Sequence, residues 1–359
     1  MGVRYTPCAD RANGGKGVSG ITGIHDSSMK VLIRGNGVAA SCSTHLLGRH
    51  GIAAALEAVD RPALPVVMLS DPALALIRDV FTQQDLFAGR PRIDRRVVAW
   101  GGADPITMPH SATIVTGAEL AGALHAAPSV AATAEPDFTV HATSPLPSGN
   151  LRQFGERSAV ATPARLRDPA DATACWIESL KSGWLFLIPS GGERAWLLCV
   201  GSALEDGLTH SRLIAPRIAV SDTTPQGFDP SPRMATDVTG PDWIACGTPA
   251  IAFDPICGDG TAQAVREAIL GAAVIATIRD GGDRSALTAH YGAMLVAAMR
   301  RHLQLSAPFY RTGGQGDWWR AAHDALAEGH DWCTARLSAL PDPRYALHGY
   351  TLIERERAA

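Results

Sequence analysis

The sequence predicts an α/β fold in which a parallel βαβ unit is interrupted by a mainly antiparallel β-sheet domain and followed by C-terminal helices. Three observations support this prediction. A short apolar strand, a glycine turn and a helix follow one another at residues 31–51. Two apolar runs separated by a glycine pair, at residues 184–200, are typical of an antiparallel hairpin. A second glycine turn leads into a long apolar helix at residues 255–279, about 220 residues after the first turn.

The first unit opens with the apolar run 31–33, which suits a parallel strand covered on both faces. Gly35, Gly37 and Ala40 then form a G-x-G-x-x-A turn. The first glycine permits a tight turn, the second lets the backbone approach a pyrophosphate, and the third position must be small. The helix start offers free N–H groups and a positive dipole end to an anion. The pattern predicts a dinucleotide-type site, and a plain βα turn is the alternative.

A second strand is expected at residues 52–59, with an acidic residue near its end. In units of this kind, an acid about 20 residues after the first glycine binds a ribose hydroxyl. Glu57 and Asp60 lie 22 and 25 residues after Gly35. Both acids fit this spacing, both are also plausible surface residues, and the sequence does not choose between them.

Helices and short strands are expected between this unit and the hairpin. We predict helices at residues 72–80 and 118–126 and strands at 97–100 and 111–115. A loop that contains Pro105, Pro109 and His110 joins the two strands. A histidine in such a loop can act as a general base toward a substrate. An exposed loop histidine without a catalytic role is the alternative.

Aromatic residues in the hairpin and near the C-terminus are the candidate walls of a substrate pocket. Trp184 and Phe186 alternate along one strand, so both side chains face the same side. They form either a pocket wall or part of the core. Trp318 begins a further helix, where it either caps an aromatic pocket or anchors the helix.

Composition excludes several classes of protein. The net charge is −3 and there is no basic stripe, so a nucleic-acid partner is not expected. The seven cysteines contain no C-x-x-C pair, which predicts free thiols and neither a disulfide framework nor a metal site. Residues 1–28 lack an apolar segment and are expected to be a disordered leader. No run of 18 apolar residues occurs, so we expect no membrane span and a cytoplasmic location.

Three blocks of the sequence resemble the superfamily of FAD-dependent monooxygenases and flavin-dependent halogenases, which has the p-hydroxybenzoate hydroxylase-like fold. The first block is the turn at Gly35. The second, residues 183–189, is similar to the W-x-W-x-I-P block of the halogenases, with Phe186 in the second Trp position. The third, residues 243–260, is similar to the W-L-A-x-G-D-A-A-x-x-x-D-P-x-x-G-x-G segment. Residues 307–319 resemble the branch that acts in tryptophylquinone biogenesis.

The resemblance implies a Rossmann-like FAD-binding domain with an inserted substrate domain. The FAD-binding domain would comprise residues 29–125 and 236–305, and the substrate-facing β-sheet domain residues 126–235. Residues 306–359 would form a C-terminal segment of helix and coil. The residues implied in FAD binding are Gly35, Gly37, Ala40, Glu57, Gly247, Thr248, Asp254, Pro255, Gly258 and Gly260.

Two departures from the family pattern bear on the cofactor. Thr248 stands where the family has an aspartate, and a hydroxyl is a weaker acceptor than a carboxylate. Ala40 replaces the third glycine of the first turn. These departures imply one of three alternatives: FAD is held loosely, reduced flavin is taken from a reductase, or the cofactor has been lost. Electrons would come from NAD(P)H or from a separate flavin reductase as partner.

The expected reaction is hydroxylation of an electron-rich aromatic substrate through a flavin C4a-hydroperoxide. The substrate would be an indole or a tryptophan, either free or within a peptide or protein. Halogenases of the family place a lysine between flavin and substrate, and no lysine occurs between Lys30 and Lys181. A flavin-dependent halogenase is therefore the first alternative. A non-catalytic binding protein on the same scaffold is the second.

Overall fold

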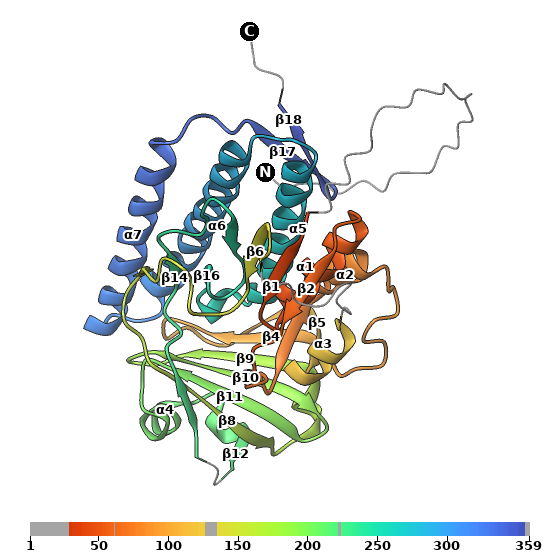
Figure 1. Ribbon diagram of the computed structural model, residues 1–359. Coiled ribbons are helices and arrows are strands. Elements are labelled where there is room, and N and C mark those ends of the chain that lie inside the picture. The colour runs from red at the N-terminus through yellow and green to blue at the C-terminus, as the bar shows by residue number, and fades with distance from the viewer. Residues whose placement is uncertain (1–28, 61, 126–134, 222–223, 356–359) are drawn as a thin grey trace, which may run out of the picture.

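The computed structural model describes residues 29–60, 62–125, 135–221 and 224–355. The predicted leader 1–28 lies outside the described residues. A four-stranded parallel sheet runs in the order β15 (Trp243–Ala245), β6 (Phe138–His141), β1 (Val31–Arg34) and β2 (Ala54–Glu57). In Figure 1 this sheet lies above a larger one that is coloured mainly green and orange.

The larger sheet has nine strands and is antiparallel except where β4 pairs with β9. Its path is β12 (Ile218–Val220), β8 (Ala159–Leu166), β11 (Arg194–Val200), β10 (Trp184–Gly191), β9 (Ala174–Ser179), β4 (Arg92–Ala99), β5 (Ile106–Val115) and β3 (Val67–Ser70), with β13 (Gln226–Phe228) beside β8. A three-stranded sheet contains β16 (Ile251–Ala252), β14 (Arg233–Ala235) and β7 (Leu151–Gln153). The hairpin of β17 (Tyr345–His348) and β18 (Thr351–Glu354) closes the described chain.

Seven α-helices occur among the described residues. They are α1 (Val38–Arg49), α2 (Asp71–Phe81), α3 (Gly117–Ala123), α4 (Leu204–His210), α5 (Gly260–Arg279), α6 (Arg284–Thr312) and α7 (Asp317–Ser338). Helices α1 and α2 pack against α5, and α6 packs along α7 (Figure 1). The predicted α/β fold, with an antiparallel sheet between the two parts of a parallel sheet and helices at the C-terminal end, is confirmed.

The predicted first unit forms as β1, α1 and β2. Gly35 has φ +130°, and a Cβ there would lie 3.0 Å from the carbonyl carbon of Ala142, the residue after β6. Only glycine allows β1 to end in such close contact with the neighbouring strand. Ala40 is fully buried, so a small side chain is required where α1 lies on the sheet.

The strands of the two main sheets do not divide at the predicted domain boundaries. The boundaries themselves stay a prediction. Strands β3, β4 and β5, assigned above to the cofactor domain, belong to the nine-stranded sheet. Strand β6, assigned to the substrate domain, pairs with β1 in the parallel sheet. The alternation of apolar residues shows that a segment is a strand, but it does not show which partner the strand will find.

The prediction of a loop around His110 was wrong, because Pro109 and His110 lie inside β5. Strand β3 pairs only with residues 112–115 of β5, so on that side β5 is an edge at Pro109. A proline is tolerated on an edge because no neighbour needs its missing N–H.

The long helix α5 is the central helix of the fold. By length and composition it could cross a membrane, but 72% of its apolar segment is buried inside the protein. It contacts α1, α2 and α6 and the C-terminal hairpin. Its apolar character is therefore explained by its position in the core.

A buried ion pair joins the nine-stranded and the three-stranded sheets to the C-terminal helices. The Nη1 atom of Arg157, which precedes β8, lies 3.2 Å from Oδ2 of Asp254, which follows β16, and both side chains are 1% exposed. The hydroxyl of Tyr310 in α6 donates to the same oxygen at 2.6 Å. Nε1 of Trp184 in β10 donates to that hydroxyl at 3.4 Å. Nη2 of Arg157 also donates to the carbonyl of Ala322 in α7 at 3.2 Å.

We expect the variant Arg157→Met to lower the free energy of unfolding by about 3–5 kcal/mol, because it leaves the carboxylate of Asp254 buried without its countercharge. Burial already raises the pKa of Asp254, and Arg157 opposes that rise. Without Arg157 this pKa rises further above its unfolded value, so the variant loses stability as pH increases. Urea unfolding at pH 5 and pH 8 measures both effects.

The matched control is Tyr310→Phe, which removes one hydrogen bond to Asp254 and keeps the ring. Its expected cost is about 1–3 kcal/mol, the usual effect of leaving a buried acceptor with one partner fewer. A stability of Arg157→Met within about 0.5 kcal/mol of the unchanged protein would show that the ion pair does not hold the layers together.

Candidate functional site

The start of α1 is the first part of the candidate site. Helices α2, α3 and α6 begin with a side-chain cap from Ser70, Thr116 and Asp283 respectively. Helix α1 follows Gly37 and has no side-chain cap, and α5, which follows Asp259, has none either. Helices α4 and α7 also begin without a side-chain cap, so the lack of a cap does not by itself identify an anion site. The first N–H groups of α1 are left for a ligand.

The turn at Gly247 contacts the start of α1, directly after the first glycine turn. Gly247 has φ +74°, and a Cβ there would lie 2.9 Å from the Cβ of Ala39 in α1. The backbone of one segment therefore packs directly against a helix that lies about 200 residues earlier in the sequence. A larger residue at position 247 would separate them.

A buried carboxyl group holds the Gly247 turn in place. The N–H of Gly247 donates to Oε2 of Glu267 in α5 at 2.6 Å, and Nε2 of Gln263 donates to Oε1 at 3.1 Å. Glu267 is 2% exposed, and its burial raises its pKa from 4.5 to about 8. At neutral pH this group is largely protonated, and it still accepts the hydrogen bond from the turn.

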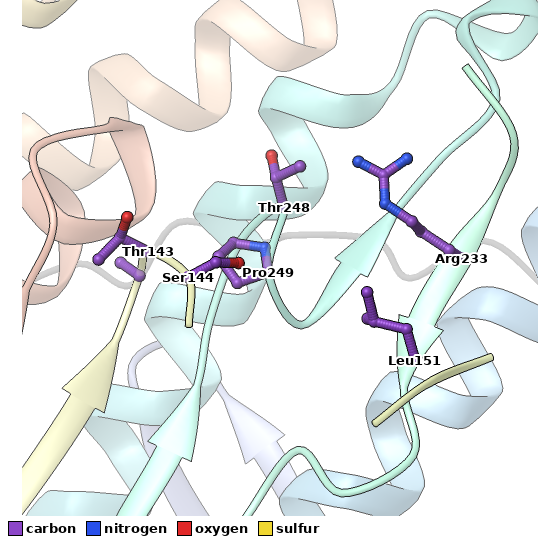
Figure 2. Close-up of a pocket in the computed structure, with 7 residues that line it drawn as sticks. Thr143, Ser144, Leu151, Arg233, Thr248 and Pro249 are labelled. Carbon is purple, nitrogen blue, oxygen red and sulfur yellow. The ribbon is translucent and has the colours of Figure 1, made fainter. Parts of the chain in front are cut away.

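A polar cavity of about 250 Å³ opens beside the two turns. Figure 2 shows Thr143 and Ser144 on one side, Arg233 and Leu151 on the other, and Thr248 and Pro249 between them. Three hydroxyl groups and one guanidinium line it, together with Ala142. Such a lining suits a ligand with hydroxyl and anionic groups.

The turn before α5 leaves space for a ligand. Pro255 opens a short 3₁₀ turn that ends at Gly258, with φ +62°. A Cβ at Gly258 or Gly260 would meet none of the described atoms within 4 Å. A planar ligand could therefore approach this backbone closely.

The carboxylate of Asp254, implied above in cofactor binding, is not free to bind a ligand. Besides Arg157 and Tyr310, it accepts a hydrogen bond from the N–H of Ile256 at 3.0 Å. Its side chain fixes the turn from inside the protein. Any contact with a ligand at this position is left to the backbone around it.

Of the two candidate acids, the structure places Glu57 beside the first turn. The N–H of Gly35 donates to the carbonyl of Glu57 at 2.9 Å, whereas Asp60 is exposed beyond the strand. Nε and Nη2 of Arg34 donate to the two carboxylate oxygens of Glu57 at 3.0 and 2.9 Å. Sequence reasoning missed Arg34, although a charged residue at the end of an apolar strand was a visible signal.

The predicted aromatic pocket residues have different surroundings. Trp184 is fully buried and Phe186 is 6% exposed. Both belong to one core, while Leu185 and Leu187 face another, so the prediction that Trp184 and Phe186 face the same side is confirmed. Both side chains pack in the core, and their role as a pocket wall stays a prediction. The half-buried ring of Trp318 covers Gly201, and its role toward a substrate stays a prediction.

The catalytic role predicted for His110 also stays a prediction, now on a strand. Its Nε2 lies 3.0 Å from Nη2 of Arg96. Burial lowers the pKa of His110, and the charge of Arg96 lowers it further. The imidazole is therefore neutral at pH 7 and can accept a proton. Among the described residues, no three His, Cys, Asp or Glu side chains gather as metal ligands would.

Comparison with known proteins shows similarity at the level of fold. No known family model matches the chain, and no curated protein matches it. The solved structure of CmlS, a flavin-dependent halogenase, matches with a TM-score of 0.71 at 19% identity, over 88% of this chain and 72% of that one. The peptidyl tryptophan dihydroxylase QhpG, essential for tryptophylquinone cofactor biogenesis, matches with a TM-score of 0.70 at 18% identity, over 92% and 86%.

A flavin-dependent halogenase from Xanthomonas campestris matches with a TM-score of 0.66 at 12% identity, over 84% of this chain and 82% of that one. The chain therefore has the fold of these flavin-dependent halogenases and hydroxylases, as the resemblance of its three blocks implied.

We expect the stability of the protein to fall as pH rises from about 4.5 to about 8, the interval between the ordinary and the raised pKa of Glu267. In this interval the folded protein keeps a proton that the unfolded chain releases, so each step up in pH favours unfolding. The variant Glu267→Gln keeps an acceptor for Gly247 and does not ionise. Its free energy of unfolding, measured in urea, should depend less on pH.

Near pH 5 the variant and the unchanged protein should have similar stability, and at pH 8 the variant should be the more stable. The control is Glu205→Gln, which removes an exposed carboxylate from α4. Parallel pH profiles for Glu267→Gln and the unchanged protein would contradict the assignment of a buried, protonated Glu267.

Proposed function

We propose that this protein is an FAD-dependent monooxygenase that hydroxylates an electron-rich aromatic substrate. The observation that carries the proposal is the contact between the Gly35 and Gly247 turns beside a polar cavity, on a fold shared with flavin-dependent halogenases and a tryptophan dihydroxylase. A single glycine turn is common, but two turns in contact beside one cavity could hold two parts of one long cofactor.

The residues around the cavity suit FAD. The uncapped start of α1 after Gly37 suits the pyrophosphate. Thr248 and the other cavity hydroxyls suit the hydroxyl groups of the ribityl chain. The open backbone at Gly258 and Gly260 suits the edge of the ring system. Bound flavin would supply the activation of molecular oxygen, and the chain would bind, orient and shield it from water.

The substrate class is inferred from chemistry and from similarity. Oxygen insertion by flavin favours electron-rich rings, so an indole, or a tryptophan in a small molecule or a peptide, is the candidate. The similarity to a peptidyl tryptophan dihydroxylase over 92% of the chain supports this choice. The reductant would be NAD(P)H or reduced flavin delivered by a separate reductase.

Halogenation is the second candidate, because CmlS is as similar in fold as the dihydroxylase. The lack of a lysine between Lys30 and Lys181 argues against it. The mass of the product formed with bromide present separates the two reactions. A bromide-dependent product would favour the halogenase, and a gain of oxygen alone would favour the hydroxylase.

The first test is a visible spectrum of the purified protein before and after addition of excess FAD and gel filtration. We expect the flavin absorption bands to be weak at first and stronger after loading, because Thr248 replaces the usual carboxylate. A colourless protein that also fails to bind reduced flavin under anaerobic conditions would refute the proposal.

The variant Thr248→Asp should bind FAD more tightly, since a carboxylate accepts hydrogen bonds from hydroxyl groups about twice as strongly as a neutral oxygen does. Thr248→Val, which keeps the shape and loses the hydroxyl, should bind FAD more weakly. Quenching of flavin fluorescence measures both affinities. Equal affinities in all three proteins would place the ligand away from Thr248.

A further inference from the structure

An ion pair lies across the ends of two neighbouring parallel strands at the edge of the candidate site. Arg34 ends β1 and Glu57 ends β2, and the two residues are in register. Two parallel hydrogen bonds, of 3.0 and 2.9 Å, join the guanidinium to the carboxylate. The side chains are 37% and 44% exposed, so a ligand in solution can reach them.

In a βαβ unit of this kind, the acid at the end of the second strand receives the ribose hydroxyls of the bound nucleotide. Here both oxygens of that acid already have a donor from within the protein. The donor is Arg34, the residue directly before Gly35, so strand β1 holds it next to the turn. The pair uses the planar, two-point geometry in which arginine binds carboxylates best.

We propose that Arg34 competes with the ribose of the cofactor for Glu57 and so sets the affinity of the site for adenosine nucleotides. This inference rests on the proposed use of FAD. Binding would exchange the hydrogen bonds of Arg34 for those of the ribose diol, so part of the binding free energy is spent on opening the ion pair. The ligand class concerned is nucleotides in which a ribose lies next to a pyrophosphate.

The size of the effect follows from the exposure of the pair. Half-exposed ion pairs contribute up to about 1 kcal/mol, which corresponds to about five-fold in a dissociation constant. The direction distinguishes this proposal from simple charge attraction. If Arg34 attracted the pyrophosphate, its removal would weaken binding, whereas removal of a competitor strengthens it.

The test is titration of FAD, ADP and FMN into four proteins: unchanged, Arg34→Met, Glu57→Gln and the double variant. Arg34→Met should bind FAD and ADP more tightly, by up to about five-fold, because Glu57 becomes free. FMN lacks the adenosine ribose and should bind the unchanged protein and Arg34→Met equally. In the presence of Glu57→Gln, the substitution of Arg34 should give no gain.

Two control variants separate this effect from a general loss of charge. Arg34→Lys keeps the charge but loses the two-point geometry, so its affinity for FAD should lie between those of the unchanged protein and Arg34→Met. Arg344→Met breaks a similar exposed pair with Glu354 in the C-terminal hairpin and should leave all three affinities unchanged. Thermal unfolding of each variant verifies that it is folded.

The outcomes for the two proposals are distinct. If FAD binds but Arg34→Met binds it equally or more weakly, the competition is refuted and the flavoprotein proposal stands. A gain that persists in the double variant also refutes the competition. If none of the four proteins binds FAD, ADP or FMN, the flavoprotein proposal fails, and the competition fails with it.

Discussion

The buried ion pair between Arg157 and Asp254 is the contact on which the arrangement of layers depends. Taking both charges out of water is costly, and this cost is offset only if both keep their partners. Asp254 meets Arg157 and Tyr310, which come from different parts of the fold, and accepts a hydrogen bond from the N–H of Ile256 in its own turn. The same residue begins the turn that leads into α5. The geometry of this turn is therefore set from the interior of the protein.

The two glycine turns illustrate how the interior fixes the site. Gly35 allows β1 to end against Ala142, and Gly247 allows its own turn to reach Ala39. Glu267, which lies in α5, holds the Gly247 turn by one short hydrogen bond. All of these contacts are made within the chain itself. A cofactor would meet a backbone that is already in position, and only side chains at the rim, such as Arg34, would have to move.

Local patterns in the sequence were sufficient for the first βαβ unit, the hairpin of β10 and β11 and the long helix α5. They were insufficient wherever a residue's partner is distant in the chain. The place of β3 to β5 in the large sheet, the burial of Trp184 against Tyr310 and the pairing of Arg34 with Glu57 depend on contacts across many residues. No spacing rule encodes these contacts, because tertiary packing selects among segments with equal local preferences.

The order of strands in the parallel sheet has a consequence for biosynthesis. Strand β1 lies at its centre, but its neighbour β6 and the outer strand β15 come roughly one hundred and two hundred residues later. At ribosomal rates of about 5–20 residues per second, the first unit waits about 10–40 seconds for β15 and α5. During this time the apolar surface of α1 that α5 will cover stays exposed. A nascent chain of this protein therefore leaves this apolar surface of α1 uncovered until α5, which ends at Arg279 of the 359 residues, has been made.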